Sequence, residues 1–560
     1  MRLKTSKTCP FGHLYSYVGT RMKDASSGIG VERLEREPLF DVVAVKLDAF
    51  WVATSTVTAA VAGVLGWLLR TWPPHEDEAL ALFVGRGSLG HVLHTVVAER
   101  GGAPLHFLLA WMVVHVGGGL IVLRVVSLLF AVASVPLIAM LGARLADRPT
   151  GVVASALAGG SWVFLFHGIF GRMYSLFLFT SLLSLLALLT ALDNGRPRRF
   201  AAWGLSLLVV LGSHPYAVLL VAAEVLFVLL RRRQLRPALV TLAAVAVAAV
   251  PFWWADVVLR NRFEVGIGGG GRRLGSPQSV LRYLWSVAGD FSSHEHVWSL
   301  CLLGLAAVGA LLLVRRNRDG ALLIACVIVV PAVAFMLATL RSTTSPEARH
   351  LIFALPLYSI LLALPLVAFA RLGGAAAAVA GVALVVIVVG EVRWAHEKTP
   401  QLFDGNPASQ VRTRDAAATW LSSTARSDDV LLGYEPVFLR AWEQNRSFSD
   451  TVLPRADPAL FADALKHVRL PLGRGIWVFD ASDTTNVRQR QTIPLVSPQP
   501  AAAFETRVYG PYLVIRSRAP LLTRARYVAV AERVMRVGQT LNINDADVNL
   551  QTMRQAESRL

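Results

Sequence analysis

A short run of acidic side chains follows the first long apolar segment of the chain. The segment Pro73-Pro74-His75-Glu76-Asp77-Glu78 places a histidine beside three carboxylates. Like charges this close raise the pKa of at least one carboxyl group, which suits a general base, while His75 and Asp77 could instead ligate a divalent cation. Acidic residues are also common in the first turn of a solvated helix, where they face the positive end of its dipole. The spacing alone slightly favours this structural role.

Further candidate side chains stand where long apolar segments begin or end. They are Arg124, Arg172, Tyr174, His214, Tyr216, Arg349 and His350. A charge at the edge of the hydrocarbon is a candidate site, and arginine can hold a phosphate through two hydrogen bonds. Each of these cations could equally anchor a helix end among lipid headgroups, and a lone histidine is more often a satisfied structural residue.

The elements that position these residues are apolar and long. Of 560 residues, 54% are hydrophobic and 16% charged, whereas soluble proteins have about 45–50% and about 25%. Several apolar segments approach the ~20 residues that span a ~30 Å hydrocarbon core. They include Val122–Leu141, Ala201–Leu211, Val218–Leu230, Ala238–Trp254, Ala321–Leu340 and Leu351–Ala370. The composition therefore predicts a polytopic α-helical membrane protein.

The basic residues predict the topology, because positive charge in short loops marks the cytoplasmic side. Besides the N-terminal tail, the basic loops are Ala143–Thr150, Asn194–Phe200, Arg231–Pro237, Arg315–Gly320 and the Arg371 turn. Two spans between each consecutive pair give eleven transmembrane helices, with the N-terminus cytoplasmic and the C-terminus outside. This count requires that Leu105–Leu120 does not cross, so we expect it to lie at the outer interface or to re-enter.

The net charge of +18 does not point to nucleic acid, since the basic residues fall in these loops and form no stripe interleaved with aromatics. The three cysteines share no metal-type spacing. We therefore expect no nucleic-acid partner.

A change in composition near Val392 predicts a second domain. Residues 396–520 alternate short apolar runs with polar helix-like stretches, which indicates an extracytoplasmic α/β domain. Residues 521–560 are expected to form a polar helical tail, residues 1–47 a cytoplasmic tail, and residues 48–395 the membrane domain.

The charge-derived topology places Asp77, Arg172, His214 and Arg349 on one side of the membrane. In this order the motifs resemble those of the membrane-embedded GT-C glycosyltransferases, especially bacterial relatives of protein O-mannosyltransferases and of lipid A aminoarabinose transferase. The matching segments are Asp77-Glu78, Gly102-Ala103-Pro104-Leu105-His106, Leu123-Arg124-Val125-Val126-Ser127, Arg172-Met173-Tyr174, Ser213-His214-Pro215-Tyr216 and Arg349-His350-Leu351-Ile352 with Leu355-Pro356. The resemblance covers about residues 48–395. Two departures, Ala103 for a proline and His350 for a tyrosine, loosen any inference about the sugar.

The resemblance implies a transferase in the cell membrane that uses a polyprenyl-phosphate sugar donor at the extracytoplasmic face. Asp77 would be the general base of an inverting transfer to a glycan, lipid or protein acceptor, with Glu78 supporting it. Positive charge from Arg349 and Arg172 would stabilise the leaving phosphate. Membrane lipids are the other expected partners. No cofactor is obligatory, and a divalent metal at His75 and Asp77 stays an open alternative.

Two other functions are compatible with a chain of this kind. A transporter or flippase for a lipid-linked substrate would place its polar site near the bilayer midplane, whereas here the polar clusters collect at one end of the apolar segments and Glu224 is the main interior charge. A non-catalytic membrane scaffold would have the same sequence features as an enzyme whose Asp77 is inactive.

Overall fold

The computed structural model describes residues 48–262, 274–293, 296–339, 346–449, 451–455, 457–482, 492–543 and 546–559. The chain divides into two units, residues 1–47 and residues 48–560. The predicted cytoplasmic tail, residues 1–47, lies outside the described residues.

The class of a polytopic helical membrane protein is confirmed. Within the described ranges, seven segments are long and apolar enough to cross a membrane: α1 (Ala49–Thr71), α5 (Leu120–Leu145), α8 (Tyr174–Asn194), α14 (His296–Arg316), α15 (Arg318–Ala338), η3 with α16 (Ala348–Ala354, Leu355–Ala370) and α17 (Gly374–Lys398). Two bent pairs raise the number to nine, namely α6 with α7 (Arg148–Gly160, Trp162–Ile169; 67°) and α11 with α12 (Leu235–Ala248, Val250–Arg262; 56°). The apolar helices α9 (Pro197–Ser213) and α10 (Ala217–Arg231) have only 17 and 15 residues. The predicted count of eleven spans is reached only if α9 and α10 also cross the membrane.

The loops predicted to be cytoplasmic meet at one end of the helix bundle. Ion pairs join Asp147 to Arg371 and Arg316, Arg148 to Asp48, Arg144 to Asp193, and Arg231 to Asp319. Asn317 also donates to the carbonyl of Leu145. Exposed pairs of this kind contribute little stability, but they show that these loops share one end of the bundle.

Which end faces the cytoplasm is tested by cysteine labelling. In a background where the native cysteines are serine, Ser88→Cys should react with an impermeant thiol reagent in intact cells. Asn194→Cys, at the other end of the bundle, should react only after lysis. Both positions are exposed, so access to the reagent depends on the membrane. Labelling of Asn194→Cys in intact cells would contradict the predicted orientation.

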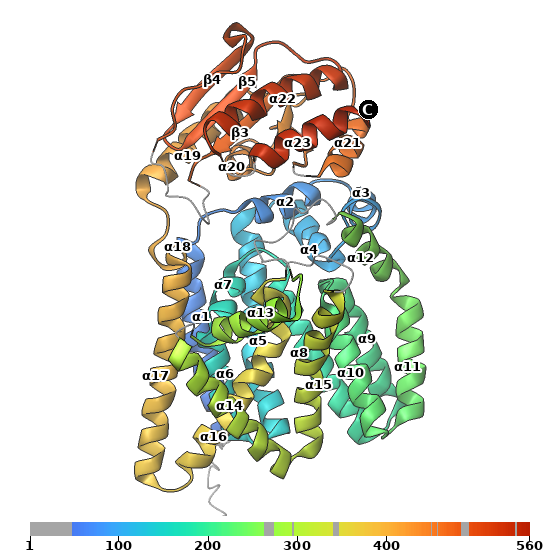
Figure 1. Cartoon of the computed structure of the whole chain (residues 1–560), viewed down its shortest axis with the longest axis vertical. Helices are drawn as coiled ribbons and strands as arrows, with labels where there is room; N and C mark the ends of the chain where they lie inside the picture. Colours follow the sequence, from blue (N-terminus) through green and yellow to red (C-terminus); the bar gives the residue numbers. More distant parts are fainter. Residues whose placement is uncertain are drawn as a thin grey trace, which may run out of the picture. The chain divides into compact units, whose positions relative to one another are not determined.

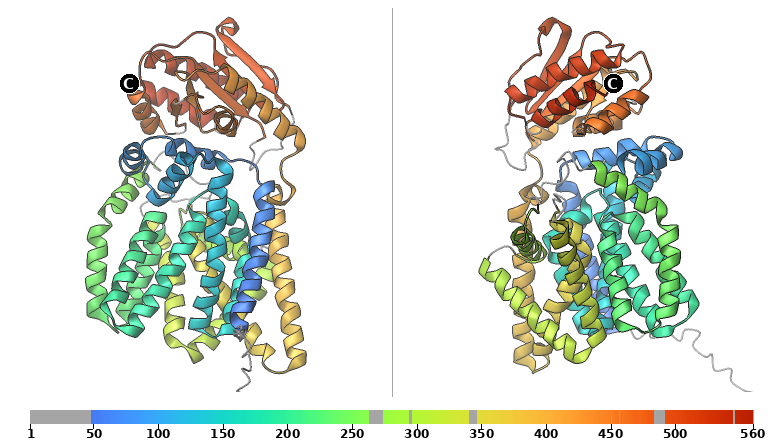
Figure 2. Two further views of the ribbon diagram at one scale, coloured as in Figure 1. Left: turned by 180° about the vertical axis from the view of Figure 1, so that it is seen from behind. Right: turned by 45° about the vertical axis from the view of Figure 1, so that its right-hand side comes forward.

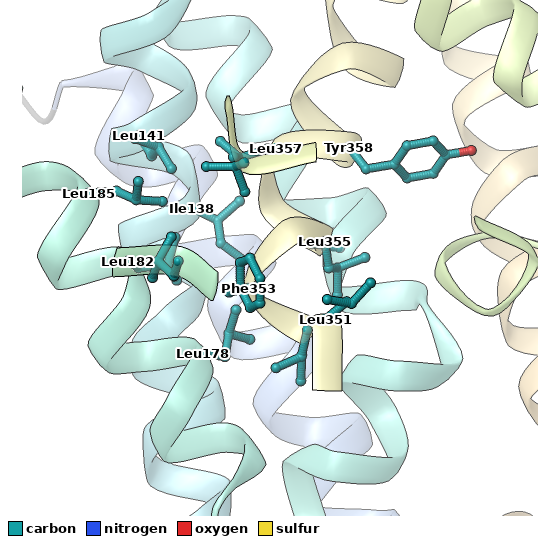
Figure 3. Packing of buried hydrophobic residues seen from close by; sticks show 14 of the residues in the cluster. Ile138, Leu141, Leu178, Leu182, Leu185, Leu351, Phe353, Leu355, Leu357 and Tyr358 are labelled. Carbon is teal, nitrogen blue, oxygen red and sulfur yellow. The ribbon is translucent and has the colours of Figure 1, made fainter. Parts of the chain in front are cut away.

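Small residues let the helices of the membrane domain approach closely. A Cβ added at Gly309 of α14 would lie 1.9 Å from the Leu361 carbonyl oxygen of α16, and one at Gly151 of α6 would lie 2.1 Å from the Ala139 carbonyl oxygen of α5. Glycine is therefore required at both contacts, as is common where membrane helices cross. Branched and aromatic side chains of α5, α8, η3 and α16 fill the space between them, as Figure 3 shows around Ile138 and Phe353.

Four short helices connect α1 to α5: α2 (Glu76–Gly85), α3 (Leu89–His94), the π-helix η1 (Thr95–Arg100) and α4 (Pro104–His115). With 12 residues, α4 extends about 18 Å and is too short to span the hydrocarbon. It covers most of the segment predicted to lie at the interface. Backbone contact at Gly85, where a Cβ would be 2.9 Å from Ala110, packs α2 tightly on α4.

The C-terminal domain contains a five-stranded mixed sheet in the order β2-β1-β3-β5-β4. The strands are β1 (Val430–Leu432), β2 (Thr451–Leu453), β3 (Gly475–Asp480), β4 (Phe504–Tyr509) and β5 (Tyr512–Ser517). β2, β1 and β3 pair in parallel, and β3, β5 and β4 pair antiparallel. The other helices of this half are α18 (Pro400–Asp404), α19 (Ala408–Thr424), α20 (Pro436–Gln444) and α21 (Pro458–His467).

In the membrane domain, one further helix, α13 (Pro277–Phe291), lies between α12 and α14 in the chain.

The segment predicted as a polar tail forms two helices that complete this domain. α22 (Arg524–Thr540) and α23 (Ala546–Glu557) bury one face against the sheet, with the ring of Tyr527 stacked on that of Trp477 at 5.8 Å. Their polar composition reflects the opposite, solvated face of each helix.

One face of the C-terminal domain packs directly on the helices that carry the acidic segment. A single apolar cluster combines Leu82, Phe83 and Val84 of α2 with Phe438 and Trp442 of α20. Arg86 donates to the carbonyls of Phe448 and Ser449. Figure 1 shows α20 facing α2, and both views of Figure 2 show the orange and red C-terminal domain over the blue helices α2, α3 and α4. The two domains therefore share a core at this end of the bundle.

Candidate active site

The start of α2 fixes the acidic segment. The backbone N–H of Asp77 donates to His75 Nδ1 at 3.2 Å, and the Glu78 carboxylate accepts from the backbone N–H of His75 at 3.2 Å. This reciprocal capping satisfies amides that a helix start leaves without partners. Asp77 therefore lies in the first turn of α2. Its side chain is half-buried: many protein atoms surround it, and part of its surface remains accessible.

Glu78 and Arg124 form a buried ion pair. Glu78 is fully buried and Arg124 is 3% exposed; Arg124 Nε lies 2.8 Å from Oε1 and Nη2 lies 2.5 Å from Oε2. Nη1 and Nη2 also donate to the carbonyls of Trp72 and Pro73, respectively, both at 2.7 Å. All three nitrogens of Arg124 are therefore occupied by protein. The pair ties the start of α2 to α5.

The same pair holds the turn that carries Arg172. Gly171 N–H donates to Glu78 Oε1 at 2.7 Å, and a Cβ at Gly171 would lie 3.0 Å from that oxygen. Ser127, one turn after Arg124, lies 3.5 Å from the Arg172 carbonyl oxygen. The turn between α7 and α8 is thus fixed against α2 and α5.

Asp77 lies among cations. Burial raises the pKa of Asp77, but the positive charges of Arg172, His75, Arg349 and His106 together outweigh burial and lower the pKa to about 2. Arg172 Nη1 also donates to the Asp77 carbonyl at 3.1 Å. For His106, burial and the Arg172 charge lower the pKa to about 3, so this ring is neutral. Asp77 is therefore a carboxylate at any physiological pH.

The wall facing Asp77 comes from η3 and from the turns before α8 and α10. The Arg349 guanidinium lies 5.2 Å from the Tyr174 ring centroid and donates to Glu347 at 2.8 Å. The His350 ring stacks on Tyr216 at 4.4 Å. Next to them, His214 stacks on Phe177 at 4.7 Å and accepts from the Tyr216 N–H at 3.0 Å. Burial, with the charges of Arg349 and Arg172, lowers the pKa of His214 to about 3.

Several polar atoms in this group have no protein partner. They are Arg172 Nε, Arg349 Nε, His106 Nε2 and His214 Nε2, all buried. Buried polar atoms in proteins are nearly always hydrogen-bonded. Four such atoms within one cluster mark a place for a polar ligand with hydrogen-bond acceptors.

A metal ion has few candidate ligands here. Among the side chains that the structure describes, no three from His, Cys, Asp and Glu lie close enough together to hold one. His75 Nδ1 already accepts a hydrogen bond from Asp77, so the pair proposed from the sequence offers at most His75 Nε2 and the carboxylate.

The structure brings together Asp77, Arg172, Tyr174, His214, Tyr216, Arg349 and His350, and it places Glu78 and Arg124 behind them. Two residues of the cluster are absent from the candidates named above. His106 follows Pro104 in a matched motif, and Glu347 lies two residues before Arg349, so proximity to motif residues is the signal that could have identified both.

Comparison with known proteins defines the fold. No protein-family model and no curated protein matches the sequence. The structure is similar to that of ArnT, a lipid A aminoarabinose transferase, from Cupriavidus metallidurans in the apo state (TM-score 0.51, 13% identity, covering 83% of this chain and 98% of that chain). It is equally similar to ArnT bound to undecaprenyl phosphate (0.51, 14%, with the same coverage). The oligosaccharyltransferase of Archaeoglobus fulgidus in the apo form has a TM-score of 0.50 at 11% identity, over 77% of this chain and 70% of that one.

These likenesses show that the chain shares the fold of ArnT and of the Archaeoglobus fulgidus oligosaccharyltransferase.

Proposed function

We propose that this protein is a glycosyltransferase that moves a sugar from a polyprenyl-phosphate donor to an acceptor hydroxyl at the extracytoplasmic face of the cell membrane. The observation that carries the proposal is the convergence of the Asp77 carboxylate with Arg172 and Arg349, whose Nε atoms lack partners. A general base and a phosphate-binding pair are the two parts that such a transfer requires.

In the proposed reaction the acceptor oxygen attacks the anomeric carbon from the face opposite the phosphate. The new carbon–oxygen bond forms as the bond to the phosphate oxygen breaks, so the anomeric configuration inverts. Asp77 takes the hydroxyl proton, and the bonding electrons leave with the polyprenyl phosphate. A phosphate is stable as an anion, so it leaves without protonation when cations face it.

Arg349 and Arg172 are the cations suited to the phosphate. Arg349 is 18% exposed and pairs with Glu347 through one nitrogen, so two other nitrogens can reach a ligand. Arg172 holds the Asp77 carbonyl with Nη1 and leaves Nε without a partner. A bound phosphate would lie between the two arginines, with its negative charge close to Asp77.

Glu78 and Arg124 are positioning residues in this proposal, because each is buried and bonded to protein. Their pair fixes both Asp77 and the Arg172 turn. Tyr174, His214, Tyr216 and His350 form the aromatic wall of the site, where neutral rings can face a sugar.

The likeness to ArnT, one structure of which is bound to undecaprenyl phosphate, favours a polyprenyl-phosphate donor. The transporter alternative is less well supported, because the partnerless arginine and histidine atoms of the cluster lie with Asp77 at one end of the bundle, while the interior Glu224 is bonded to Ser184 and Trp203 at 2.8 and 2.6 Å.

The pH dependence of transfer should depend on Arg172. The charge of Arg172 is the largest influence that lowers the pKa of Asp77, so Arg172→Gln should raise that pKa. The carboxylate would then be lost at a higher pH, and the acidic limb of the kcat/KM profile should move upward relative to the native enzyme. Arg198→Gln, at the opposite end of the bundle, should leave the profile unchanged. Superimposable limbs for Arg172→Gln and the native enzyme would remove Arg172 from the surroundings of Asp77.

Arg349 is expected to determine donor affinity. Arg349→Lys keeps the charge but not the planar fork of donors, so it should restore only part of the affinity that Arg349→Ala loses. Donor KM should rise in both variants, and it should rise more in Arg349→Ala. An unchanged donor KM in both would exclude Arg349 from the phosphate site.

The proposed function is tested with the purified protein in proteoliposomes. Radiolabelled polyprenyl-phosphate sugars and a membrane extract as acceptor should give a labelled product and free polyprenyl phosphate. If the folded protein consumes none of a panel of such donors, the transferase proposal fails.

A further inference from the structure

The carboxyl ends of two parallel strands form a second candidate site, in the C-terminal domain. β1 and β3 are neighbours, yet the chain leaves β1 through α20 towards β2 on one side and leaves β3 towards β4 and β5 on the other. In open sheets with parallel strands, ligands bind outside the carboxyl ends at such a switch point.

A recess that opens to solvent lies at this point. We call it the strand-end recess, and its lining includes Leu432, Glu435, Arg455, Trp477, Asp480 and Asn549. Gly433 turns the chain directly after β1 with φ +84°, and a Cβ there would lie 3.1 Å from Arg455 Cδ. The turn is therefore shaped to admit the Arg455 side chain.

Two buried polar atoms of the lining have no partner. Asn549 is 4% exposed and its Oδ1 accepts no hydrogen bond; Trp477 is 1% exposed and its Nε1 donates none. Leaving such atoms unbonded in a protein interior is unfavourable. One is an acceptor and the other a donor, which suits a ligand whose groups both give and take hydrogen bonds.

The charges of the recess disfavour an anion. Glu435 and Asp480 contribute two carboxylates against the single cation of Arg455. Arg455 is paired with Glu435 and with Glu76, and Asp480 accepts from the Ser482 N–H at 2.7 Å. A neutral ligand rich in hydroxyl groups meets carboxylate, amide and indole groups without a charge penalty.

The recess is also linked to the candidate active site. Arg455 lines the recess and pairs with Glu76, the residue before Asp77. Only the Arg455 side chain therefore separates a molecule in the recess from the first turn of α2.

We propose that the strand-end recess binds a neutral sugar residue and, given the proposed function, that this sugar belongs to the acceptor. The C-terminal domain would then select the acceptor, while the membrane domain binds the donor. Asn549 Oδ1 would accept from one sugar hydroxyl and Trp477 Nε1 would donate to another.

Saturation-transfer NMR on the full chain in nanodiscs tests this proposal without any donor. The probes are the methyl pyranosides of mannose, glucose and galactose. At least one should receive saturation from the native protein, and its affinity should fall about tenfold in Asn549→Leu and in Trp477→Phe. Gln551→Leu, on the exposed face of α23, is the matched control and should bind as the native protein does. Thermal unfolding curves should show that each variant remains folded at the temperature of the experiment.

The transfer assay separates this proposal from the proposed function. Asn549→Leu should raise the acceptor KM about tenfold and leave the donor KM unchanged. If the native protein transfers no sugar but Asn549→Leu loses glycoside binding, the transferase assignment fails and the sugar site stands. Glycoside binding that is equal in the native protein, Asn549→Leu and Trp477→Phe, or that is absent from all of them, would overturn the proposal.

Discussion

Asp77→Asn should reduce sugar transfer by at least about a hundredfold, because general-base catalysis contributes roughly 10²–10⁴-fold. Asparagine has the size of aspartate, and the Asp77 backbone bonds to His75 and Arg172 do not involve its carboxylate. Folding and donor binding should therefore survive. Initial rates at saturating donor and acceptor measure the effect, and donor binding is measured separately with polyprenyl phosphate.

Glu76→Gln is a matched control for this variant. It removes a neighbouring carboxylate in the same turn that pairs with Arg455 and is not among the main charges acting on Asp77. It should retain most donor turnover at saturating acceptor. A folded Asp77→Asn protein with near-native transfer would contradict the role of Asp77 as base and leave the fold as described.

Arg124→Met should destabilise the protein by about 3–5 kcal/mol, because it leaves the fully buried Glu78 without its counter-charge. The expected result is a lower thermal midpoint and a smaller folded fraction by size-exclusion chromatography in detergent. The substitution should act through this loss of stability and not directly on catalysis, since Arg124 has no free nitrogen for a substrate.

The other end of the same helix supplies the comparison. Arg144 on α5 pairs with Asp193 at 2.7 Å, with side chains 31% and 51% exposed, so Arg144→Met should cost about 1 kcal/mol or less. Replacing both Arg124 and Glu78 by methionine should recover part of the stability lost in the single variant, because no buried charge then stands alone. Equal stability of Arg124→Met and the native protein would show that the Arg124–Glu78 pair does not stabilise the fold.

Much of the membrane domain could be predicted from sequence because its signals are local. Apolar length indicates a span, and basic loops indicate which ends belong together. The ion pairs of Asp147 with Arg316 and Arg371 join loops far apart in the chain at one end of the bundle. The same reasoning predicted that Asp77, Arg172, His214 and Arg349 share a side, and the structure brings them into one cluster.

The roles within the cluster could not be predicted, because they depend on pairings across distant segments. Glu78 and Arg124 are 46 residues apart, and nothing in either segment indicates that the two side chains form a buried ion pair. The sequence alone places Glu78 beside Asp77 as its support and Arg124 among the candidate cations, without pairing the two. For the same reason the polar composition of residues 521–560 gave no sign that Tyr527 and Trp477 stack in a shared core.

The central claim is that one site binds the donor phosphate between Arg172 and Arg349, with Asp77 facing the reacting carbon. A cryo-EM structure of the full chain in nanodiscs with polyprenyl phosphate tests this claim without knowledge of the sugar. The account predicts phosphate oxygens about 2.7–2.9 Å from nitrogens of Arg349 and Arg172, next to the Asp77 carboxylate. A phosphate bound at the opposite end of the bundle, or away from both arginines, would contradict it.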